Sequence, residues 1–324
     1  MLTIIIDGNN LAHRAKHVFS LSNKGKDVSV VYGFLHTMQS YIRKFKPTAC
    51  IVCWDGGTPE FRRQAVQEYK ANRDHSNDDP LAYEDFLRQM HELCDYAFPM
   101  MGIVSIRKPG AEADDLMYHA SRVVKGRKII ITSDKDLFQA ISVEYQTTVY
   151  NPARDALYDN EKFEAEYGIP VSKYLDWKAM IGDNSDNIPG VYGVGEKTAT
   201  KLLTTFGELT NIVNRAQGHP VDKSLIMSDK IINAFNSFGF ARIVKNIYVM
   251  ALWADRVGAR HTIITGIKAY HPADKDRMKR YLLRNAFVSL MEEFPAQLSR
   301  LSAPVITDEP FRMPIICAYR SPVL

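Results

Sequence analysis

The sequence predicts an α/β fold in which a mostly parallel central sheet is flanked by helices. Three short apolar runs have the length and β-branched content of buried strands: LTIIID at 2–7, TACIVCW at 48–54 and RKIIIT at 127–132. Segments that read as helices separate these runs, and this alternation is typical of parallel sheets. Ligands of such sheets bind beyond the carboxyl ends of the strands, so we expect the functional site there.

The remaining elements of the first half follow in chain order. Helices are expected at 10–20 and 30–45, between the first and second strands. Thr58-Pro59-Glu60 indicates a helix start, with Thr as N-cap and Pro in the first turn. A short strand at 102–106 and a helix at 112–124 are expected before the third strand.

The second half has a different character, because the strand signal fades after about residue 160. Residues 161–303 read as a helical region with glycine-rich turns, and the last residues contain four prolines and no helical period. The expected organisation is therefore a core at 1–160, a helical region at 161–303 and an extended tail at 304–324.

Composition excludes several protein classes. The 324 residues are 46% hydrophobic, which is enough for a sizeable core, and the four cysteines are too few for a disulfide framework. Cys50 and Cys53 fall in an apolar strand, where residues three apart point to opposite faces. They therefore read as buried thiols rather than a redox or metal pair. No basic leader or membrane-length apolar run is visible, so a soluble intracellular protein is expected.

Short acidic clusters are the most informative feature. Three of the acids directly follow strands, and Glu112 and Asp115 would share one helix face. Packed carboxylates need a cation, and oxygen ligands without Cys or His suit Mg²⁺ or Mn²⁺. Any one cluster could equally be a solvated surface or a helix cap, but their joint position at strand ends favours a metal site. The acids are Asp7, Asp55, Glu112, Asp114, Asp115, Asp134, Asp136, Asp183 and Asp186.

The charge distribution points to the substrate class. The chain has 41 Lys and Arg against 37 Asp and Glu, and the nine clustered acids make the remainder clearly basic. Residues 187–303 alone carry 16 basic and 9 acidic side chains. An acidic metal pocket in a basic body suits a polyanion and metal-assisted chemistry on its phosphates.

Two further motifs suggest phosphate contacts. In EYKANR, Lys70 and Arg73 are three apart and would share a helix face, although a solvated basic face has the same pattern. In GVYGVGEKT, Glu196 interrupts what would otherwise be a P-loop ending in Lys197. No strand precedes Gly190, so an NTPase is disfavoured. The glycines instead suggest a helix start that binds a different phosphate.

The ordered set of motifs resembles the 5′ nuclease family, over roughly residues 1–250. The motifs are IDGNN, WDGG, EYKANR, GAEADD, TSDKDLFQ and IGDNSDNIPGVYGVGEKTA. This family comprises the 5′-to-3′ exonuclease domain of bacterial DNA polymerase I, phage 5′ exonucleases and flap endonucleases. The resemblance implies a PIN-like nuclease core that hydrolyses DNA by a two-metal mechanism in replication or repair.

The resemblance also implies roles for the acids. One Mg²⁺ ion, replaceable by Mn²⁺, would generate hydroxide from water, and the second would stabilise the leaving oxygen. The first site would use Asp7, Asp55, Glu112, Asp114, Asp115 and Asp134, and the second Asp136, Asp183 and Asp186.

The DNA contacts follow from the same resemblance. A helical arch would span about 71–97, with Lys70 stabilising phosphate charge and Arg73 clamping the strand at its base. Tyr69 could stack on a terminal base, and Arg14 would lie near the 5′ strand. The acidic HSNDDP segment leaves open whether the arch threads single strands.

A helix–three-turn–helix motif at about 185–206 would grip duplex phosphates and, as in the family, bind a potassium ion. Its DNA-binding residues would be Gly193, Val194, Gly195, Lys197, Thr198 and Lys201.

Several alternatives stay open at this point. A non-catalytic structure-specific DNA-binding protein is disfavoured because every expected acid and Lys70 are present. No feature decides between DNA and RNA–DNA hybrids, or between exonuclease and endonuclease activity. QLSRL at 297–301 weakly resembles a sliding-clamp peptide, or is simply the end of an amphipathic helix. The expected form is a monomer in the cytoplasm of a bacterial or phage-infected cell.

Overall fold

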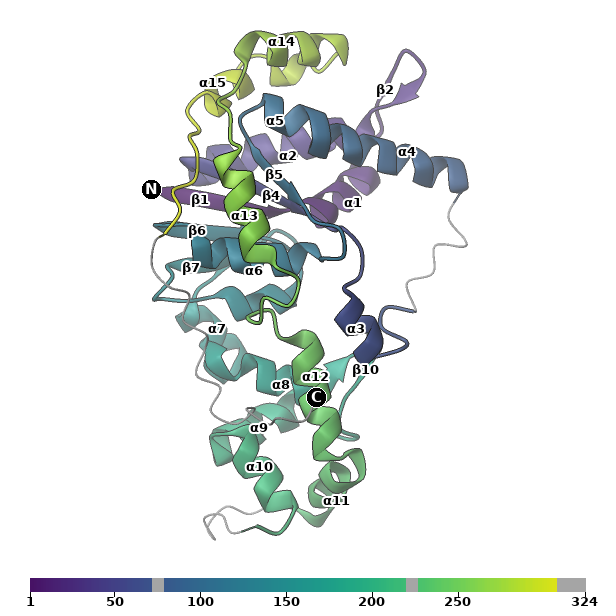
Figure 1. Cartoon of the computed structure of the whole chain (residues 1–324), viewed down its shortest axis with the longest axis vertical. Helices are drawn as coiled ribbons and strands as arrows, with labels where there is room; N and C mark the ends of the chain where they lie inside the picture. The colour runs from purple at the N-terminus through teal and green to yellow at the C-terminus, as the bar shows by residue number, and fades with distance from the viewer. Residues whose placement is uncertain (72–78, 220–226, 308–324) are drawn as a thin grey trace. The chain divides into compact units, whose positions relative to one another are not determined.

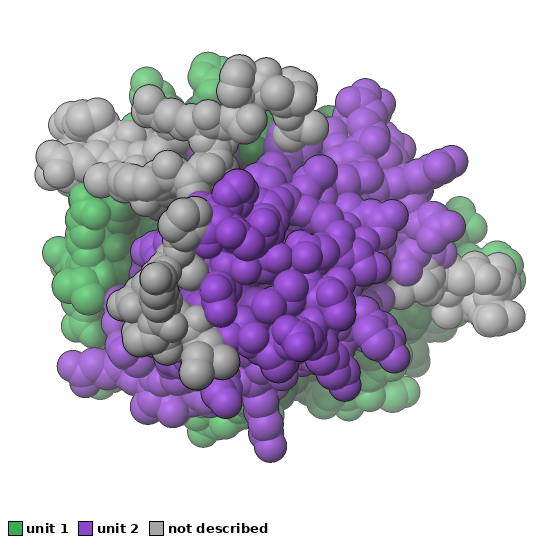
Figure 2. Space-filling model, turned by 90° about the horizontal axis from the view of Figure 1, so that it is seen from below, with its two compact units in different colours: residues 1–59, 75–157, 255–311 green, residues 60–74, 158–254, 312–324 purple. Residues whose placement is uncertain are grey.

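In the computed structural model, the described residues are 1–71, 79–219 and 227–307 (Figure 1). They divide into two compact units, coloured separately in Figure 2. The first unit contains residues 1–59, 79–157 and 255–307, and the second contains 60–71, 158–219 and 227–254. This division differs from the expected boundaries, because residues 255–307 return to the first unit and residues 60–71 join the second.

A six-stranded sheet forms the centre of the first unit, in the order β5-β4-β1-β6-β7-β8. The pairs β1–β4, β1–β6, β4–β5 and β6–β7 are parallel, so the predicted fold class is confirmed. The strands β7 and β8 were not anticipated. The strands are β1 (Leu2–Asp7), β4 (Ala49–Trp54), β5 (Val104–Arg107), β6 (Arg127–Ile131), β7 (Thr147–Asn151) and β8 (Ala156–Tyr158).

The helices of the first unit cover this sheet. Three of them lie close to the helices expected at 10–20, 30–45 and 112–124: α1 (Gly8–Val18), α2 (Ser29–Phe45) and α6 (Ala113–Val123). Within the expected arch lie α4 (Pro80–His91) and the π-helix η1 (Glu92–Ala97). The short helices α5 (Phe98–Met100) and the 3₁₀ helix η2 (Lys135–Ala140) were not anticipated. A small hairpin of β2 (Ser22–Asn23) and β3 (Lys26–Asp27) separates α1 from α2.

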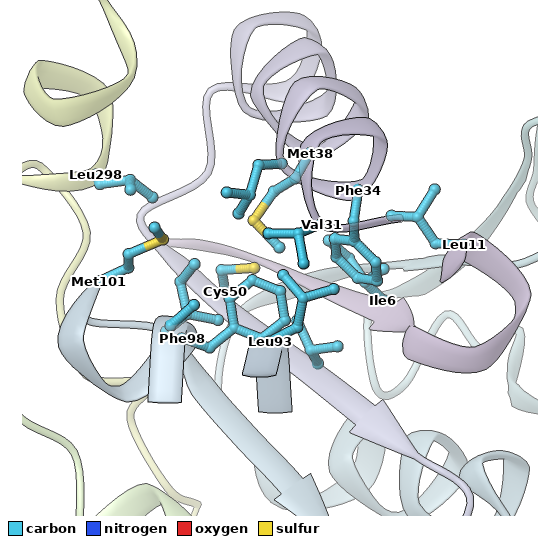
Figure 3. Close-up of a cluster of buried hydrophobic side chains, with 14 of the residues drawn as sticks. Ile6, Leu11, Val31, Phe34, Met38, Cys50, Leu93, Phe98, Met101 and Leu298 are labelled. Carbon is cyan, nitrogen blue, oxygen red and sulfur yellow. The ribbon is translucent and has the colours of Figure 1, made fainter. Parts of the chain in front are cut away.

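The end of the described chain completes the same unit. Its elements are α13 (Ala259–Lys268), α14 (Lys275–Arg284), the 3₁₀ helix η4 (Val288–Leu290) and α15 (Phe294–Leu298). Helix α13 packs on α6, and α15 packs on α2. Figure 3 shows Leu298 among the side chains of the main core, with Phe34 and Phe98. Leu298 and Leu301 are 1% and 7% exposed, so the apolar residues of QLSRL belong to the core and are not available to a sliding clamp.

The second unit is mainly helical. It contains α3 (Glu60–Ala65), α7 (Asn160–Tyr167), the 3₁₀ helix η3 (Val171–Lys173), α8 (Tyr174–Ile181), α9 (Glu196–Phe206), α10 (Leu209–Ala216), α11 (Asp229–Phe238) and α12 (Phe240–Met250). A two-stranded hairpin, β9 (Gly182–Asp183) with β10 (Ile188–Pro189), lies between α8 and α9.

Cys50 and Cys53 on β4 are buried free thiols, as is Cys94. Burial raises the pKa of both β4 thiols well above its ordinary value, which agrees with an inert structural role. No helix in the three described stretches has the length and apolarity that a membrane span requires.

Candidate functional site

Asp7 ends β1 at the carboxyl edge of the sheet and is 7% exposed. It caps α1 by accepting a hydrogen bond from the Asn10 backbone N–H (2.9 Å), and the Thr132 hydroxyl donates to its Oδ2 (2.9 Å). Burial raises the pKa of Asp7 to about 6, and the nearby charge of Asp55 adds to this rise, although both hydrogen bonds oppose it. A buried carboxylate beside a second one is an arrangement that a cation would stabilise.

Asp55 follows β4, the strand paired with β1, and links it to α6. Its Oδ1 accepts a hydrogen bond from the Ala113 N–H (2.7 Å), while its own N–H donates to Asn9 Oδ1 (2.9 Å). Glu112 and Asp115 form a capping box at the start of α6, in which Asp115 Oδ2 accepts from the Glu112 N–H (3.4 Å), and both are buried. Both acids therefore lie in the first turn of α6, Glu112 as its N-cap and Asp115 three residues later.

Asp134 and Asp136 follow β6 and are joined to Asp7 through Thr132. The Asp134 N–H donates to Thr132 Oγ1 (3.0 Å), and Asp134 Oδ1 accepts from the Asp136 N–H (2.8 Å) as the cap of η2. Asp114 lies close to the same edge, since burial together with the charges of Asp7 and Asp114 raises the pKa of Cys53. The structure therefore brings all seven acids of the first unit to one edge of the sheet.

The donor chemistry of this edge fits a hard divalent cation, because its ligand atoms are carboxylate oxygens. Within residues 1–71, 79–219 and 227–307, however, no three Asp, Glu, His or Cys side chains already converge as a metal cage. The hydrogen bonds described above connect these carboxylates to backbone N–H groups and a hydroxyl. Side-chain rotation would be needed for several of them to reach one ion.

Asp183 belongs to the second unit, on β9, and has a different environment from the acids above. Lys178 Nζ donates to its Oδ2 (2.5 Å), and Ser185 donates to its Oδ1 through both its N–H (2.8 Å) and its hydroxyl (2.6 Å). Burial opposes ionisation, but Lys178 and Ser185 outweigh it and lower the pKa of Asp183. Asp183 is thus already engaged in organising its own loop.

Asp186, in the same loop, positions the predicted catalytic lysine. Tyr69 donates its hydroxyl to Asp186 Oδ2 (3.1 Å), and Lys70 Nζ lies 3.8 Å from the same oxygen. The Lys70 N–H also donates to the Asp186 carbonyl (3.1 Å). Asp186 and Lys70 therefore form one cluster within the second unit.

Two expectations for EYKANR need correction. Helix α3 ends at Ala65, and Lys70 has a φ of 56°, so it occupies a turn rather than a helix face. The Lys70 bond to the Asp186 carbonyl holds this left-handed conformation. Tyr69 is only 9% exposed and uses its hydroxyl internally, so it is not placed to stack on a base. Arg73 lies outside the described residues, as does part of the expected arch.

The predicted phosphate-binding loop joins α8 to α9. Gly193 has a φ of 75°, Gly195 is the N-cap of α9, and a side chain at either position would enter open space. The backbone at this helix start is therefore accessible to a phosphate. Val194 differs, since its N–H bonds the Val191 carbonyl (3.0 Å) and its side chain is 4% exposed, so it anchors the loop. Lys197 and Lys201 are exposed on α9, and Thr198 is half-buried.

Arg14 is exposed on α1, in the first unit. Sequence reasoning missed the residues that position the acids, chiefly Asn9, Thr132 and Lys178. Asn9 lies within the IDGNN motif and Thr132 within TSDKDLFQ, so these motifs could have identified both residues. No sequence motif indicated a role for Lys178. It also missed Tyr192, which is 86% exposed beside Gly193.

Two family models match successive parts of the chain. Residues 2–168 match the 5′-3′ exonuclease N-terminal resolvase-like domain, and residues 169–254 match the 5′-3′ exonuclease C-terminal SAM fold. Similar curated proteins are bacterial DNA polymerases I. The thermostable polymerase of Thermus filiformis is 33% identical over 65% of this chain, and that of Thermus aquaticus is 31% identical over 90%. The polymerase of Synechocystis is 31% identical over 78%. These matches cover 24%, 33% and 27% of the relatives, so the chain spans about a quarter to a third of their length.

Solved structures agree on the fold. The T5 D15 flap endonuclease, in a pseudo-enzyme–product complex with DNA and metal ions, has a TM-score of 0.64 at 21% identity. That match covers 90% of this chain and all of the T5 chain. The catalytic core of Rad2 in complex with DNA substrate has a TM-score of 0.54 at 17% identity, covering 87% of each chain. With two family models spanning residues 2–254 and polymerase I relatives above 30% identity, this chain belongs to the 5′-3′ exonuclease family.

Proposed function

We propose that the chain is a metal-dependent 5′ nuclease that hydrolyses DNA phosphodiester bonds at 5′ ends and flaps, in replication or repair. The observation that carries this proposal is the gathering of Asp7, Asp55 and Glu112 at one edge of the sheet, in a chain of the 5′-3′ exonuclease family. The buried Asp7, with its pKa of about 6 beside Asp55, supports a cation at this edge.

The proposed metals are two Mg²⁺ ions, which Mn²⁺ could replace. The candidate ligands of the second ion are Asp136, Asp183 and Asp186. Those of the first ion are the other six acids: Asp7, Asp55, Glu112, Asp114, Asp115 and Asp134. When bound, such ions supply Lewis-acid polarisation of the scissile phosphate and a lowered pKa of water. Thr132 and Asn9 act as positioning residues, because they hold Asp7 and the Asp55 backbone.

Lys70 is the proposed cationic group at the reacting phosphate. Its ammonium lies 3.8 Å from Asp186 Oδ2, and this contact fixes its position. Arg73 would clamp the strand, and Arg14 would contact the 5′ strand from α1.

The α8–α9 loop is the proposed grip on duplex DNA. Gly193 and Gly195 would let α9 N–H groups reach a backbone phosphate, with Lys197, Thr198 and Lys201 adding side-chain contacts. Main-chain oxygens of the same loop would hold a potassium ion. We further propose a monomer in the cytoplasm.

The decisive test is cleavage of a labelled 5′-flap DNA in Mg²⁺. The variant Asp134→Ala should retain DNA binding in EDTA and lose cleavage, because Asp134 belongs to the carboxylate edge. The exposed acid Glu292, changed to Gln, is the control that should keep both. Retained cleavage by a clean Asp134→Ala preparation would overturn the proposal. A matched RNA–DNA hybrid in the same gel decides the substrate preference.

A further inference from the structure

We propose that a groove on the first unit binds a single-stranded segment of nucleic acid, an inference that rests on the nuclease function proposed above. The groove is a cavity of about 450 Å³ lined by residues of the β2–β3 hairpin, α4, η1 and α14. In Figure 1, the labels β2, α4 and α14 lie in the upper part of the picture, within the first unit. None of the lining residues belongs to the carboxylate edge or to the α8–α9 loop.

The first argument is uncompensated positive charge. Lys24, Lys26 and Arg284 line the groove and are exposed, and in the described part of the chain none of them takes part in an ion pair. The fourth cation, Arg88, is different, because it pairs with Asp85 (2.8 Å) and Glu92 (3.3 Å). Three unpaired cations around one groove are the pattern expected where phosphates bind.

The second argument is an aromatic wall in the same groove. Tyr96 on η1 is 42% exposed, and its ring centroid lies 5.9 Å from that of Tyr281 on α14. The Tyr281 hydroxyl donates to Glu92 (2.7 Å), which holds this wall in place. The Arg277 guanidinium lies 5.1 Å from the centre of the Tyr96 ring. Tyr281 itself is buried (6% exposed), so Tyr96 supplies the ring that a base can reach. A cation beside an exposed aromatic ring is a usual platform for unpaired bases.

The third argument is the composition of α14. This helix carries five cations and one acid, Asp276. It begins about twenty residues after residue 254, where the match to the family models ends. Arg277, Tyr281 and Arg284 are spaced four and three apart, so they share one face of the helix. Arg284 and Tyr281 line the groove and Arg277 packs on Tyr96, so this basic face is turned towards the groove.

The dimensions favour a single strand over a duplex. A groove of about 450 Å³ lies in the size range of small-ligand sites and admits one or two nucleotides, far less than a double helix. Phosphate charge would meet Lys24, Lys26 and Arg284, and a base would meet Tyr96. An acidic protein segment would pair with the cations but would not need an aromatic ring for stacking, so a nucleic acid fits both features better.

The test measures single-strand affinity without cleavage, by fluorescence anisotropy of labelled oligo-dT of about 20 nucleotides in EDTA. The variant Lys24→Gln/Lys26→Gln/Arg284→Gln removes the three groove cations. Its affinity should fall about tenfold or more, and the slope of log K against log salt should fall by about 2, since each phosphate contact contributes about 0.7. Tyr96→Ala should weaken binding without changing that slope.

The matched control is Arg127→Gln/Lys268→Gln/Arg300→Gln, which removes three exposed, unpaired cations elsewhere on the described first unit. Circular dichroism and thermal melting confirm that both triple variants are folded. Equal single-strand affinity of the two triple variants would overturn the inference, as would absent binding by the unaltered protein. Failure of the proposed nuclease appears separately, as absent flap cleavage by the unaltered protein in Mg²⁺.

Discussion

A few uncharged side chains decide where the acids of the first unit lie. Thr132 donates to Asp7 and accepts from the Asp134 N–H, so one hydroxyl connects the ends of β1 and β6. Asn9, just after β1, accepts a hydrogen bond from the N–H of Asp55, just after β4, and so connects the ends of these two strands. These side chains carry no charge, yet a hydrogen bond of this kind contributes about 1 kcal/mol and fixes the direction of its partner.

The raised pKa of Asp7 predicts a gain in stability for Asp7→Asn when divalent ions are absent. The pKa is about 6 in the folded protein against an ordinary 3.8. Between these pH values the native state keeps a proton that the unfolded chain has lost, so stability falls as pH rises to about 6. Asn cannot ionise and still caps α1. At pH 8 in EDTA, Asp7→Asn should be more stable by at most about 3 kcal/mol.

The measurement is urea unfolding at pH 8 and pH 4, with Glu292→Gln as control. The advantage of Asp7→Asn should shrink at pH 4, because the wild-type carboxyl is then protonated in the folded protein and partly protonated in the unfolded chain. A variant less stable than wild type at pH 8 would show that Asp7 is stabilised as an anion.

At the scale of elements, the turn between α8 and α9 has two functions in one short segment. Gly182 and Gly190 approach each other so closely that a Cβ at Gly190 would lie 2.1 Å from the Ile181 carbonyl oxygen. This contact closes the β9–β10 hairpin and brings Asp183 and Asp186 into one loop. After this hairpin, the Val194 N–H bonds the Val191 carbonyl and anchors the loop. The next residue, Gly195, is the N-cap of α9.

The Lys178–Asp183 pair predicts that Asp183 is a structural residue as well as a candidate ligand. Their side chains are 10% and 15% exposed. Asp183→Ala would leave a buried ammonium unpaired and should cost about 3–5 kcal/mol in the free energy of unfolding. Lys178→Met/Asp183→Ala should recover most of that stability. Flap cleavage should stay low in the double variant; recovery of both properties would make Asp183 structural only.

The open space at Gly195 predicts a selective loss of duplex binding. Its φ of −92° suits any residue, so Gly195→Leu adds bulk without backbone strain. The added side chain should block phosphate access to the α9 N–H groups and lower duplex affinity about tenfold, equivalent to 1.4 kcal/mol. The measurement is anisotropy with blunt duplex DNA in EDTA. Ser172→Leu, at an exposed position of the same unit, is the control; equal affinities would remove this loop from the DNA interface.

At the scale of the whole chain, the first unit is assembled from distant parts of the sequence. Residues 255–307 contribute Met278, Leu282, Phe287, Phe294 and Leu298 to the core built by β1, α2 and β4. The final described segment also bridges to the end of α6, through Val124 and Ile306. The first unit therefore closes only after the second unit has been synthesised.

This closure predicts a large effect of a substitution far from the sheet in sequence. Phe294 is 0% exposed, and Phe294→Ala should lower the free energy of unfolding by about 3–5 kcal/mol. Val288→Ala, at a position 70% exposed, should change it by less than about 0.5 kcal/mol. Thermal and urea unfolding of both variants provide the comparison. Similar small effects would mean that residues 255–307 are a dispensable appendage.

The sequence by itself determined the fold class, because the continuous apolar runs of β1, β4 and β6 and the helices between them are local properties of the chain. It also predicted that Asp7, Asp55 and Asp134 lie at one edge of the sheet, since parallel strands bring their carboxyl ends together. Only the tertiary structure decided to which unit residues 60–71 and 255–307 belong, because packing between distant segments produces no pattern in the local sequence. It likewise decided that Lys70 lies in a turn held by Asp186 and that Tyr69 is buried. Those outcomes depend on hydrogen bonds between residues more than a hundred positions apart, which spacing along the chain does not encode.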